Sequence, residues 1–498
     1  MTKDTALWRR LFTDRSALES LDGAELRLHH PERREVCYEP EGPSATNIFG
    51  MSTIVRRPEG GWRLYYRGGV FCETLGRKKS GTGGMFAADS SDGLTWKLVT
   101  RKSLLDADTF MPTASAHPLA ATVFGDDNPD CPPDEYYKMI FAAEYQGRDR
   151  LFMFLAVSGD GVRFRLKSRE PFDISSDFDT QNILFWDKMI GQYRLYTRTR
   201  RFGIRGIRMH LTGDFKKFTN SADLVYYDDC FPKTQLYTNC IMPYFRAPGL
   251  YVGFPGRYVD NGQVWDENVL SRPELARRRA LAVAADEVRL ATASTDSLFM
   301  ASSDGWSFHR RDESFVRPGP CTRGNWIYGD DFFAYGMILT PSHLGDGAPD
   351  EISMYLHENY RGSTPGRLRR LTLRQDGFVS VHFPAAGGEI VTRPFVFTGS
   401  ALSVNISTGA WGRCRATVLD ESGAPVPEYS GSFDLCGDAL DMVLRWKGAA
   451  ADMRPLRGRT LKLVITGRDA DLYSFAQEKT VPRLELPPLA VTRKEPAI

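Results

Sequence analysis

The sequence lacks the motifs that mark metal, redox and membrane proteins. Its 8 cysteines stand singly, without a CxxC pair, so neither a zinc site nor a redox motif is indicated, and we expect no metal and no cofactor. No apolar run approaches the length of a membrane span, and the first residues contain no apolar signal segment. We therefore expect a cytoplasmic protein with reduced thiols; paired disulfides are the alternative if the chain is exported.

The chain also lacks an excess of charge of one sign. Its 64 Lys and Arg against 62 Asp and Glu leave a net charge of +2, which argues against a nucleic-acid partner bound by phosphate neutralisation. A hydrophobic fraction of 42% excludes a disordered chain, and 498 residues exceed one ordinary domain. Aromatic residues (12%), 45 Gly and 29 Pro are typical of many short strands joined by turns.

One short pattern recurs along the chain: Ser-x-Asp-Gly-x-x-aromatic at 90–96, 158–164 and 302–308, with a degenerate copy at 212–218. An Asp-Gly step suits a tight turn, because glycine accepts a positive φ. Strand-like runs precede each copy, and a fifth unit ends in RQDGFVSV at 374–381. Five units of four strands predict a five-bladed β-propeller in which each Asp-Gly turn joins a blade's third and fourth strands.

The predicted fold class is therefore all-β, a five-bladed β-propeller followed by a C-terminal β-sandwich. A capping pattern inside the fourth unit predicts one inserted helix near 271–290. The domains are expected at 1–44 (an N-terminal segment), 45–384 (the propeller), 385–478 (the β-sandwich, through which the chain can oligomerise) and 479–498 (a tail). The blades are expected near 45–105, 115–175, 178–228, 235–318 and 328–384.

These features carry a family resemblance. The five units, the recurring turn, and phrases such as DDNPDCPPDEYYK (126–138) and FDTQNILFWD (178–187) resemble the five-bladed glycoside hydrolases of families 32 and 43, and uncharacterised bacterial proteins described as family-32-like. The resemblance implies a carbohydrate substrate and a glycosidase that removes a terminal sugar, a furanose or an acidic sugar. Family 32 opens its first blade with Asn-Asp-Pro-Asn, whereas this chain has Asn47 without an aspartate, so no catalytic residue carries over.

Since no catalytic residue carries over from the family, the candidate site residues must be inferred from their positions on the predicted strands. In a propeller blade, the start of the first strand and the end of the second strand reach the same rim. The strand-one starts are Asn47, His117, Asp179 with Gln181 and Asn182, Asn239, and Asp330 with Asp331. The strand-two ends are Arg67 and Glu73, Glu144, Arg198 and Arg200, Arg257, and His357 with Glu358.

Glycoside hydrolysis needs two carboxyl groups, one of them protonated near neutral pH. We expect Asp179 to be the nucleophile or base, held ionised by Gln181 and Asn182, and Glu144 to be the acid, because it follows the apolar run MIFAA. Glu358 would orient or tune one of them. Glu73 is a further candidate, although it can simply pair with the neighbouring basic residues.

The remaining candidates would bind the substrate. Arginine recognises carboxylate, sulfate and phosphate groups through paired hydrogen bonds, so Arg67, Arg198 and Arg257 fit such a role, or else they neutralise the carboxylates. Trp326, Tyr237 and Tyr328 precede blade-opening strands and can stack on a sugar or pack in the core. A non-catalytic carbohydrate-binding propeller is the alternative function, favoured by the absent family motif. A sialidase would need six blades.

Overall fold

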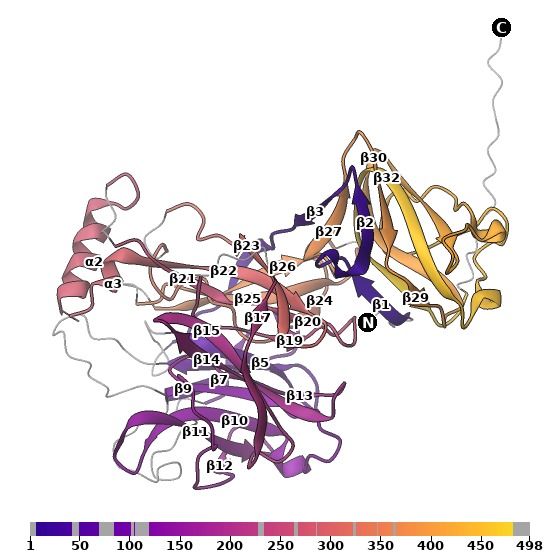
Figure 1. Cartoon of the computed structure of the whole chain (residues 1–498). Coiled ribbons are helices and arrows are strands. Elements are labelled where there is room, and N and C mark those ends of the chain that lie inside the picture. The colour runs from indigo at the N-terminus through magenta and orange to yellow at the C-terminus, as the bar shows by residue number, and fades with distance from the viewer. Residues whose placement is uncertain are drawn as a thin grey trace. The chain divides into compact units, whose positions relative to one another are not determined.

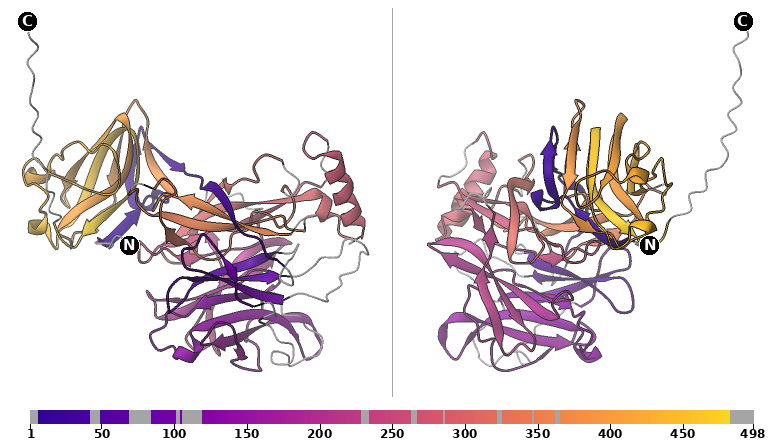
Figure 2. Two further views of the ribbon diagram at one scale, coloured as in Figure 1. Left: turned by 180° about the vertical axis from the view of Figure 1, so that it is seen from behind. Right: turned by 45° about the vertical axis from the view of Figure 1, so that its right-hand side comes forward.

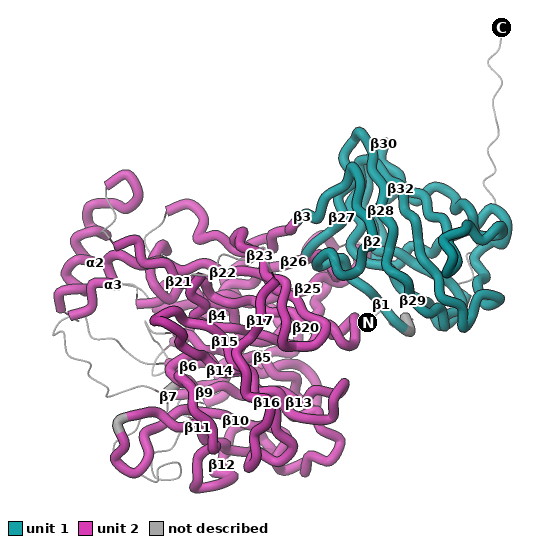
Figure 3. Tube along the Cα trace, in the orientation of Figure 1, with its two compact units in different colours: residues 1–27, 379–498 teal, residues 28–378 magenta. Residues whose placement is uncertain are grey.

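The computed structural model describes residues 6–41, 49–68, 84–100, 104, 119–227, 234–262, 267–284, 286–321, 325–345, 347–361 and 365–481. The chain divides into two compact units, shown in Figure 3. Unit 2 contains Leu28–Phe378, and unit 1 combines Met1–Arg27 with Val379–Ile498.

Unit 2 is a propeller of five sheets, as predicted (Figures 1 and 2). The strands of the first three blades are β5 (Gly50–Arg56), β6 (Trp62–Gly68), β7 (Gly84–Ser90) and β8 (Lys97–Leu98); β9 (Leu119–Gly125), β10 (Tyr137–Tyr145), β11 (Arg148–Ser158) and β12 (Arg165–Leu166); and β13 (Ile183–Asp187), β14 (Gln192–Arg201), β15 (Ile204–Thr212) and β16 (Phe218–Asp223).

The fourth blade has more strands than the others, and the outer strand of the fifth blade comes from the N-terminal part of the chain. Blade 4 contains β18 (Gln235–Leu236), β19 (Met242–Pro243), β20 (Tyr251–Gly253), β21 (Gly256–Asp260), β22 (Ala293–Ser302) and β23 (Ser307–Val316), with β17 (Val225–Tyr226) added in parallel outside. Blade 5 contains β24 (Ile338–Thr340), β25 (Glu351–Glu358), β26 (Arg367–Leu373) and, as its outer strand, β4 (Glu32–Tyr38).

The outer strand of blade 5 differs from the sequence prediction. We expected it at 374–381, but β26 pairs instead with β4, in a register that places Leu368 opposite Tyr38. Residues Val379–Phe383 form β27, which joins the sheet of unit 1. An N-terminal strand that completes the last blade covers an open sheet edge and closes the ring. At the inner edge, a parallel bridge between Thr53 and Tyr335 links blades 1 and 5.

The Asp-Gly turns lie between the third and fourth strands of their blades, which confirms that prediction. In blade 1, the Ser90 hydroxyl accepts the Gly93 N–H at 2.8 Å, while Asp92 accepts the N–H groups of Leu94 and Thr95. The turns around Asp160, Asp214 and Asp304 repeat this pattern. Each turn is thus held by its own side chains.

A tyrosine from the preceding blade clasps three of these turns. Tyr65 donates to the carbonyl of Gly161 (2.9 Å), and the same contact joins Tyr196 to Gly305 and Tyr355 to Gly93 (both 2.6 Å). In the degenerate copy, Phe215 takes the glycine position and has a φ of 60°. Its side chain packs on a hydrophobic cluster that contains Ile140, and Ile140 takes the place of the tyrosine. The repeat therefore encodes blade-to-blade packing as well as local turns.

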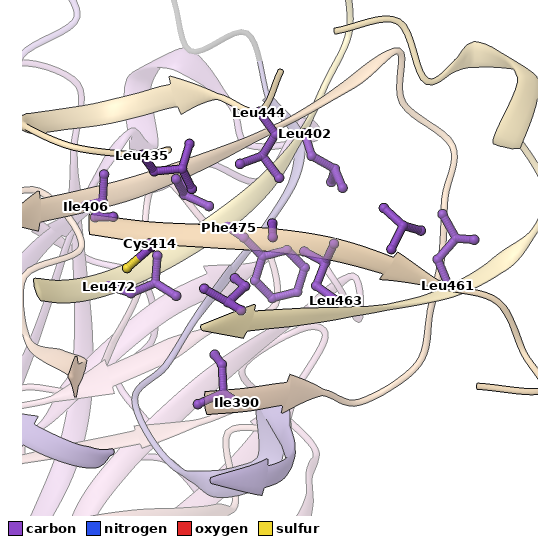
Figure 4. Packing of buried hydrophobic residues seen from close by; sticks show 14 of the residues in the cluster. Ile390, Leu402, Ile406, Cys414, Leu435, Leu444, Leu461, Leu463, Leu472 and Phe475 are labelled. Carbon is purple, nitrogen blue, oxygen red and sulfur yellow. The ribbon is translucent and has the colours of Figure 1, made fainter. Parts of the chain in front are cut away.

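Unit 1 is all-β and has its own hydrophobic core. Its strands are β1 (Ala6–Leu11), β2 (Leu18–Asp22), β3 (Glu25–Leu28), β27, β28 (Gly388–Thr392), β29 (Phe395–Val396), β30 (Ala401–Leu419), β31 (Asp438–Val443) and β32 (Thr460–Glu478). Buried Leu402, Leu463 and Phe475 lie within this core (Figure 4). The N-terminal strands β1 and β2 pair with β32 and β28, so the predicted β-sandwich also recruits part of the segment expected to stand apart.

Helices are few among the described residues. The inserted helix appears as α2 (Arg272–Ala284) and α3 (Arg289–Thr292) between β21 and β22. Leu281 and Leu290 bury their side chains against Tyr258 and Tyr328, so the insertion covers one side of blade 4. Single 3-10 turns lie at Arg15–Ala17, Pro133–Glu135, Pro427–Tyr429 and Arg454–Leu456. No helix in the described part of the chain has the length and apolarity needed to cross a membrane.

Candidate active site

The second strands of all five blades carry polar side chains toward one end of the propeller, here called the rim. Chain direction places the Asp-Gly turns at the opposite end, because the third strand runs back from the rim. The predicted strand-two residues lie on the expected strands: Arg67 on β6, Glu144 on β10, Arg198 on β14, Arg257 on β21 and Glu358 on β25.

The inner positions of several blades are polar, buried and bonded to one another. The Gln181 amide donates to the carbonyl of Ser52 in blade 1 (2.8 Å), and the Cys240 thiol donates to the carbonyl of Phe333 in blade 5 (3.2 Å). Asn239 donates to the carbonyl of Gln181 at 3.3 Å. These contacts tie blades together around the ring.

Asn182 belongs to the same inner set. Its amide donates to the carbonyls of Phe178 and Thr180, both at 3.0 Å. The amide donors of Gln181 and Asn182 thus go to main-chain carbonyls, and the Gln181 oxygen accepts the Cys240 thiol at 3.4 Å. These donors are therefore not directed at Asp179, contrary to the expectation that they hold it ionised.

Asp331 is the most unusual carboxyl group of the rim. It lies in the turn that precedes the inner strand of blade 5, where Ser297 donates to its carbonyl and its φ is 58°. Its side chain is 3% exposed, and the Arg33 guanidinium donates to Oδ1 at 2.6 Å. Burial raises the pKa of Asp331 to about 7, with Arg33 opposing and Glu358 and Asp296 adding to the rise. Its Oδ2 has no hydrogen-bond partner in the described part of the chain.

Glu358 stands beside Asp331 but in the opposite electrostatic state. Arg33 bridges the two carboxyl groups, donating to Glu358 at 2.7 Å. Arg367 donates to its other oxygen at 2.8 Å, and Arg369 donates as well. These hydrogen bonds and charges hold the pKa of Glu358 below its ordinary value despite its burial. One guanidinium thus joins a carboxyl with a raised pKa to one that stays ionised.

Asp330 and Asp296 complete this carboxyl cluster. Asp330 is buried and accepts the Tyr360 N–H at 2.7 Å; burial and the neighbouring Asp331 raise its pKa well above the ordinary value. Asp296 binds Arg257 and Ser314. The expected substrate ligand Arg257 is therefore committed to a carboxylate.

Asp179 belongs to another blade and precedes β13, the inner strand of blade 3. Its side chain is 58% exposed, and one oxygen lies 3.7 Å from the Arg198 guanidinium. The same arginine forms a two-point pair with Asp177 at 2.7 and 2.9 Å, and Arg200 binds Asp177 too. Asp179 thus keeps its oxygens largely open to solvent, while Asp177 is held by two arginines.

The other expected residues are placed as follows. Glu144 ends β10 opposite Leu151 and is exposed, so it lacks the apolar surroundings that its role as acid required. Trp326 donates through its indole to the carbonyl of Gly319 at 2.9 Å, which anchors its own loop. Arg67 is half-buried. Asn47, Glu73 and His117 lie outside the described residues.

Two groups of site residues escaped the sequence analysis. Arg33 comes from the N-terminal segment, and nothing local to it indicates that β4 reaches blade 5. Arg205 and Tyr258 form part of a buried aromatic and basic group beside Asp179, in which Tyr237 lies at the centre. Alternation of basic and apolar residues along β14 and β15 was the only available signal for the arginines.

Metal binding has no support in the described residues. No group of three or more His, Cys, Asp or Glu side chains there is arranged to hold an ion.

No family model matches the chain, and no curated protein matches it. Several solved structures are similar to it at low identity. One is an N-acetylgalactosamine deacetylase from F. plautii, in complex with blood group B trisaccharide (12% identity, 70% of this chain, 95% of that chain, TM-score 0.42). Another is a thermostable family-43 glycoside hydrolase (13%, 68%, 93%, 0.42). A third comes from a study of the GH130 family of mannoside phosphorylases and its hydrolases that target beta-1,2 mannosidic linkages in Candida mannan (12%, 70%, 94%, 0.42).

Proposed function

We propose that this protein is a glycosidase that uses Asp331 as its general acid. The observation that carries the proposal is the Arg33 bridge between Asp331, whose pKa is raised to about 7, and Glu358, whose pKa is lowered. Two carboxyl groups pushed into opposite protonation states are the requirement for acid–base cleavage of a glycosidic bond.

The free oxygen of Asp331 supports the acid role. When protonated, a buried carboxyl with an unpartnered oxygen has a donor without an acceptor, which is a costly arrangement in a folded protein. A substrate oxygen placed at this point would accept that proton. The leaving group of a glycoside supplies such an oxygen.

Glu358 tunes Asp331 in this scheme, and Asp179 attacks. Three arginines occupy the oxygens of Glu358, which leaves it a poor nucleophile but a fixed negative charge near Asp331. Asp179 is exposed and only weakly paired, so its oxygens are available to act as nucleophile or base. This keeps the roles expected for Asp179 and Glu358 from the sequence and moves the acid from Glu144 to Asp331.

The experiment compares Asp331→Asn with Glu144→Gln on aryl glycosides and oligosaccharides. Loss of the acid should lower kcat by about 10²- to 10⁴-fold in Asp331→Asn, and Glu144→Gln should stay near the wild type. A dinitrophenyl glycoside, whose leaving group needs no proton, should restore much of the Asp331→Asn rate. Thermal unfolding of both variants checks that the fold is intact.

The pH profile gives an independent reading. An acid with a pKa of about 7 is protonated below that pH, so wild-type turnover should fall as the pH rises through 7, and Asp331→Asn should lose this falling limb. A profile and rate that depend on Glu144 instead would overturn the assignment. Glycan binding without hydrolysis of any substrate would favour the second candidate function, a carbohydrate-binding propeller.

A further inference from the structure

Side chains from three blades and the inserted helix gather beside Asp179 in one arginine–tyrosine cluster. The cluster consists of Arg198 (β14), Arg205 (β15), Arg289 (α3), Tyr237, Tyr258 and Tyr328. The Tyr237 ring centroid lies 6.2 Å from that of Tyr258 and 5.4 Å from that of Tyr328. Tyr258 and Tyr328 are 5.7 Å apart, so the three rings form one aromatic surface.

The arginines of the cluster lie over these rings. Arg198 and Arg205 have their guanidinium carbons 5.1 and 5.2 Å from the Tyr237 centroid, and Arg205 also lies 4.8 Å from that of Tyr258. Arg289 covers Tyr328 at 4.6 Å. Stacking on aromatic faces fixes the guanidinium planes and leaves their N–H edges for other partners.

Each of the three arginines keeps a buried N–H without an acceptor among the described residues. These donors are Nη1 of Arg198, Nε of Arg205 and Nε of Arg289. Arg198 is 2% exposed, so bulk water does not reach this donor. Buried charged donors without acceptors are costly, and several of them in one cluster suit a ligand rich in acceptors.

The charge balance points to the same conclusion. Among the described residues, Arg205 forms no ion pair; it donates to the neutral amide of Gln235. Burial and the positive charge of Arg200 and Arg198 lower the pKa of Arg205 from its ordinary value. Asp177 is shared by Arg198 and Arg200, and Glu287 is shared by Arg289 and Arg361. The three arginines of the cluster and these two neighbours thus face three carboxylates, those of Asp177, Asp179 and Glu287.

We propose that the arginine–tyrosine cluster binds an oxyanion, the carboxylate or sulfate group of an acidic glycan. An oxyanion supplies acceptors alone, which matches donors that have none, and paired N–H groups suit its geometry. The buried tyrosine rings fix the positions of the three guanidinium groups. This inference rests on the proposed function, because it names the substrate class of the same rim: Arg198 lies beside Asp179.

The test measures binding to the full chain by calorimetry, with glucuronate, glucose and sodium sulfate as probes. Glucuronate should bind, glucose should bind at least tenfold more weakly, and sulfate should compete with glucuronate. Arg205→Gln removes the unpaired charge without a buried ion-pair partner left behind, and should weaken glucuronate binding by about tenfold or more. Arg163→Gln is the matched control, because it removes an exposed arginine from the Asp-Gly turn of blade 2.

Each result decides a separate point. Sulfate binding that Arg205→Gln weakens, without competition by glucuronate, would support the oxyanion site but assign it to a free anion. No binding of either anion, or equal losses in Arg205→Gln and Arg163→Gln, would overturn the proposal. Binding requires no turnover, so Asp331→Asn should bind glucuronate normally even while hydrolysis fails. Efficient hydrolysis of neutral glycans alone would overturn the oxyanion site and leave the glycosidase standing.

Discussion

The two ends of the propeller differ in how their contacts are made. At the Asp-Gly end, each turn is closed by Ser or Thr and Asp side chains two or three residues away in the chain, and three of the turns also accept a hydrogen bond from a tyrosine of the preceding blade. At the rim, Arg33 binds Asp331 and Glu358, which lie 298 and 325 residues further along the chain. Arg289 comes from the inserted helix α3. Short-range contacts recur and can be read as a pattern, whereas the rim is unique in every blade.

The difference has an electrostatic side as well. The turn carboxylates accept several backbone N–H groups, which lower the pKa of Asp160 to about 2 and keep it charged. At the rim the same residue type is buried without such donors, and burial raises the pKa of Asp331 to about 7. One end therefore uses aspartate to hold the fold, and the other has an aspartate that can exchange a proton near neutral pH.

The largest stability effect should come from a methyl group at a clasped turn. Gly161 has φ 68°, and an added Cβ would lie 2.4 Å from the Tyr65 hydroxyl oxygen. Gly161→Ala should lower the free energy of unfolding by roughly 2–4 kcal/mol, through both the left-handed backbone and the clash. Gly147→Ala at the rim has the same φ with nothing within 4 Å, and should cost about 1 kcal/mol. Denaturant unfolding of both variants measures the difference; equal losses would mean that the clasp contributes nothing.

A smaller effect should appear in the pH profile when Glu358 loses its charge. Glu358 raises the pKa of Asp331, so Glu358→Gln should move the falling limb of the wild-type rate to lower pH, by up to about one unit. Glu135 is a matched carboxylate at the other end, bound by Arg165 and Lys167. Glu135→Gln should leave the limb where it is. A limb that does not move in Glu358→Gln would show that Glu358 does not tune the acid.

The smallest effect concerns one hydrogen bond of the clasp. Tyr196→Phe removes the 2.6 Å bond to the Gly305 carbonyl and should lower the free energy of unfolding by about 1–2 kcal/mol, because a buried carbonyl loses its donor. Tyr258→Phe at the rim removes only a long 3.4 Å contact to Asp260 and should cost less. Thermal unfolding of the pair tests whether the tyrosines of the turn end carry more stability than those of the rim.

The candidate site was predictable in outline and not in detail. Register placed Asp179, Arg198 and Glu358 on the rim, because alternation and strand direction are local properties. The protonation states of these side chains could not be predicted from the sequence, because they depend on burial and on charged residues of other blades. Glu144 illustrates the limit: its apolar run packs inside the blade, while the carboxyl itself emerges into solvent.

The sequence by itself determined the repeating part of this protein: strand alternation, the Asp-Gly turns, the number of blades and the inserted helix, all of which arise from contacts within a few residues. Only the tertiary structure decided how the ring closes, because β26 can take its last partner from either direction along the chain and the N-terminal strand β4 takes that place. That choice brings Arg33 to Asp331 and Glu358, where it joins the two carboxyl groups and opposes the rise that burial causes in the pKa of Asp331. A pairing across more than three hundred residues leaves no local pattern, and the proton it controls depends on solvent exclusion that exists only in the folded chain.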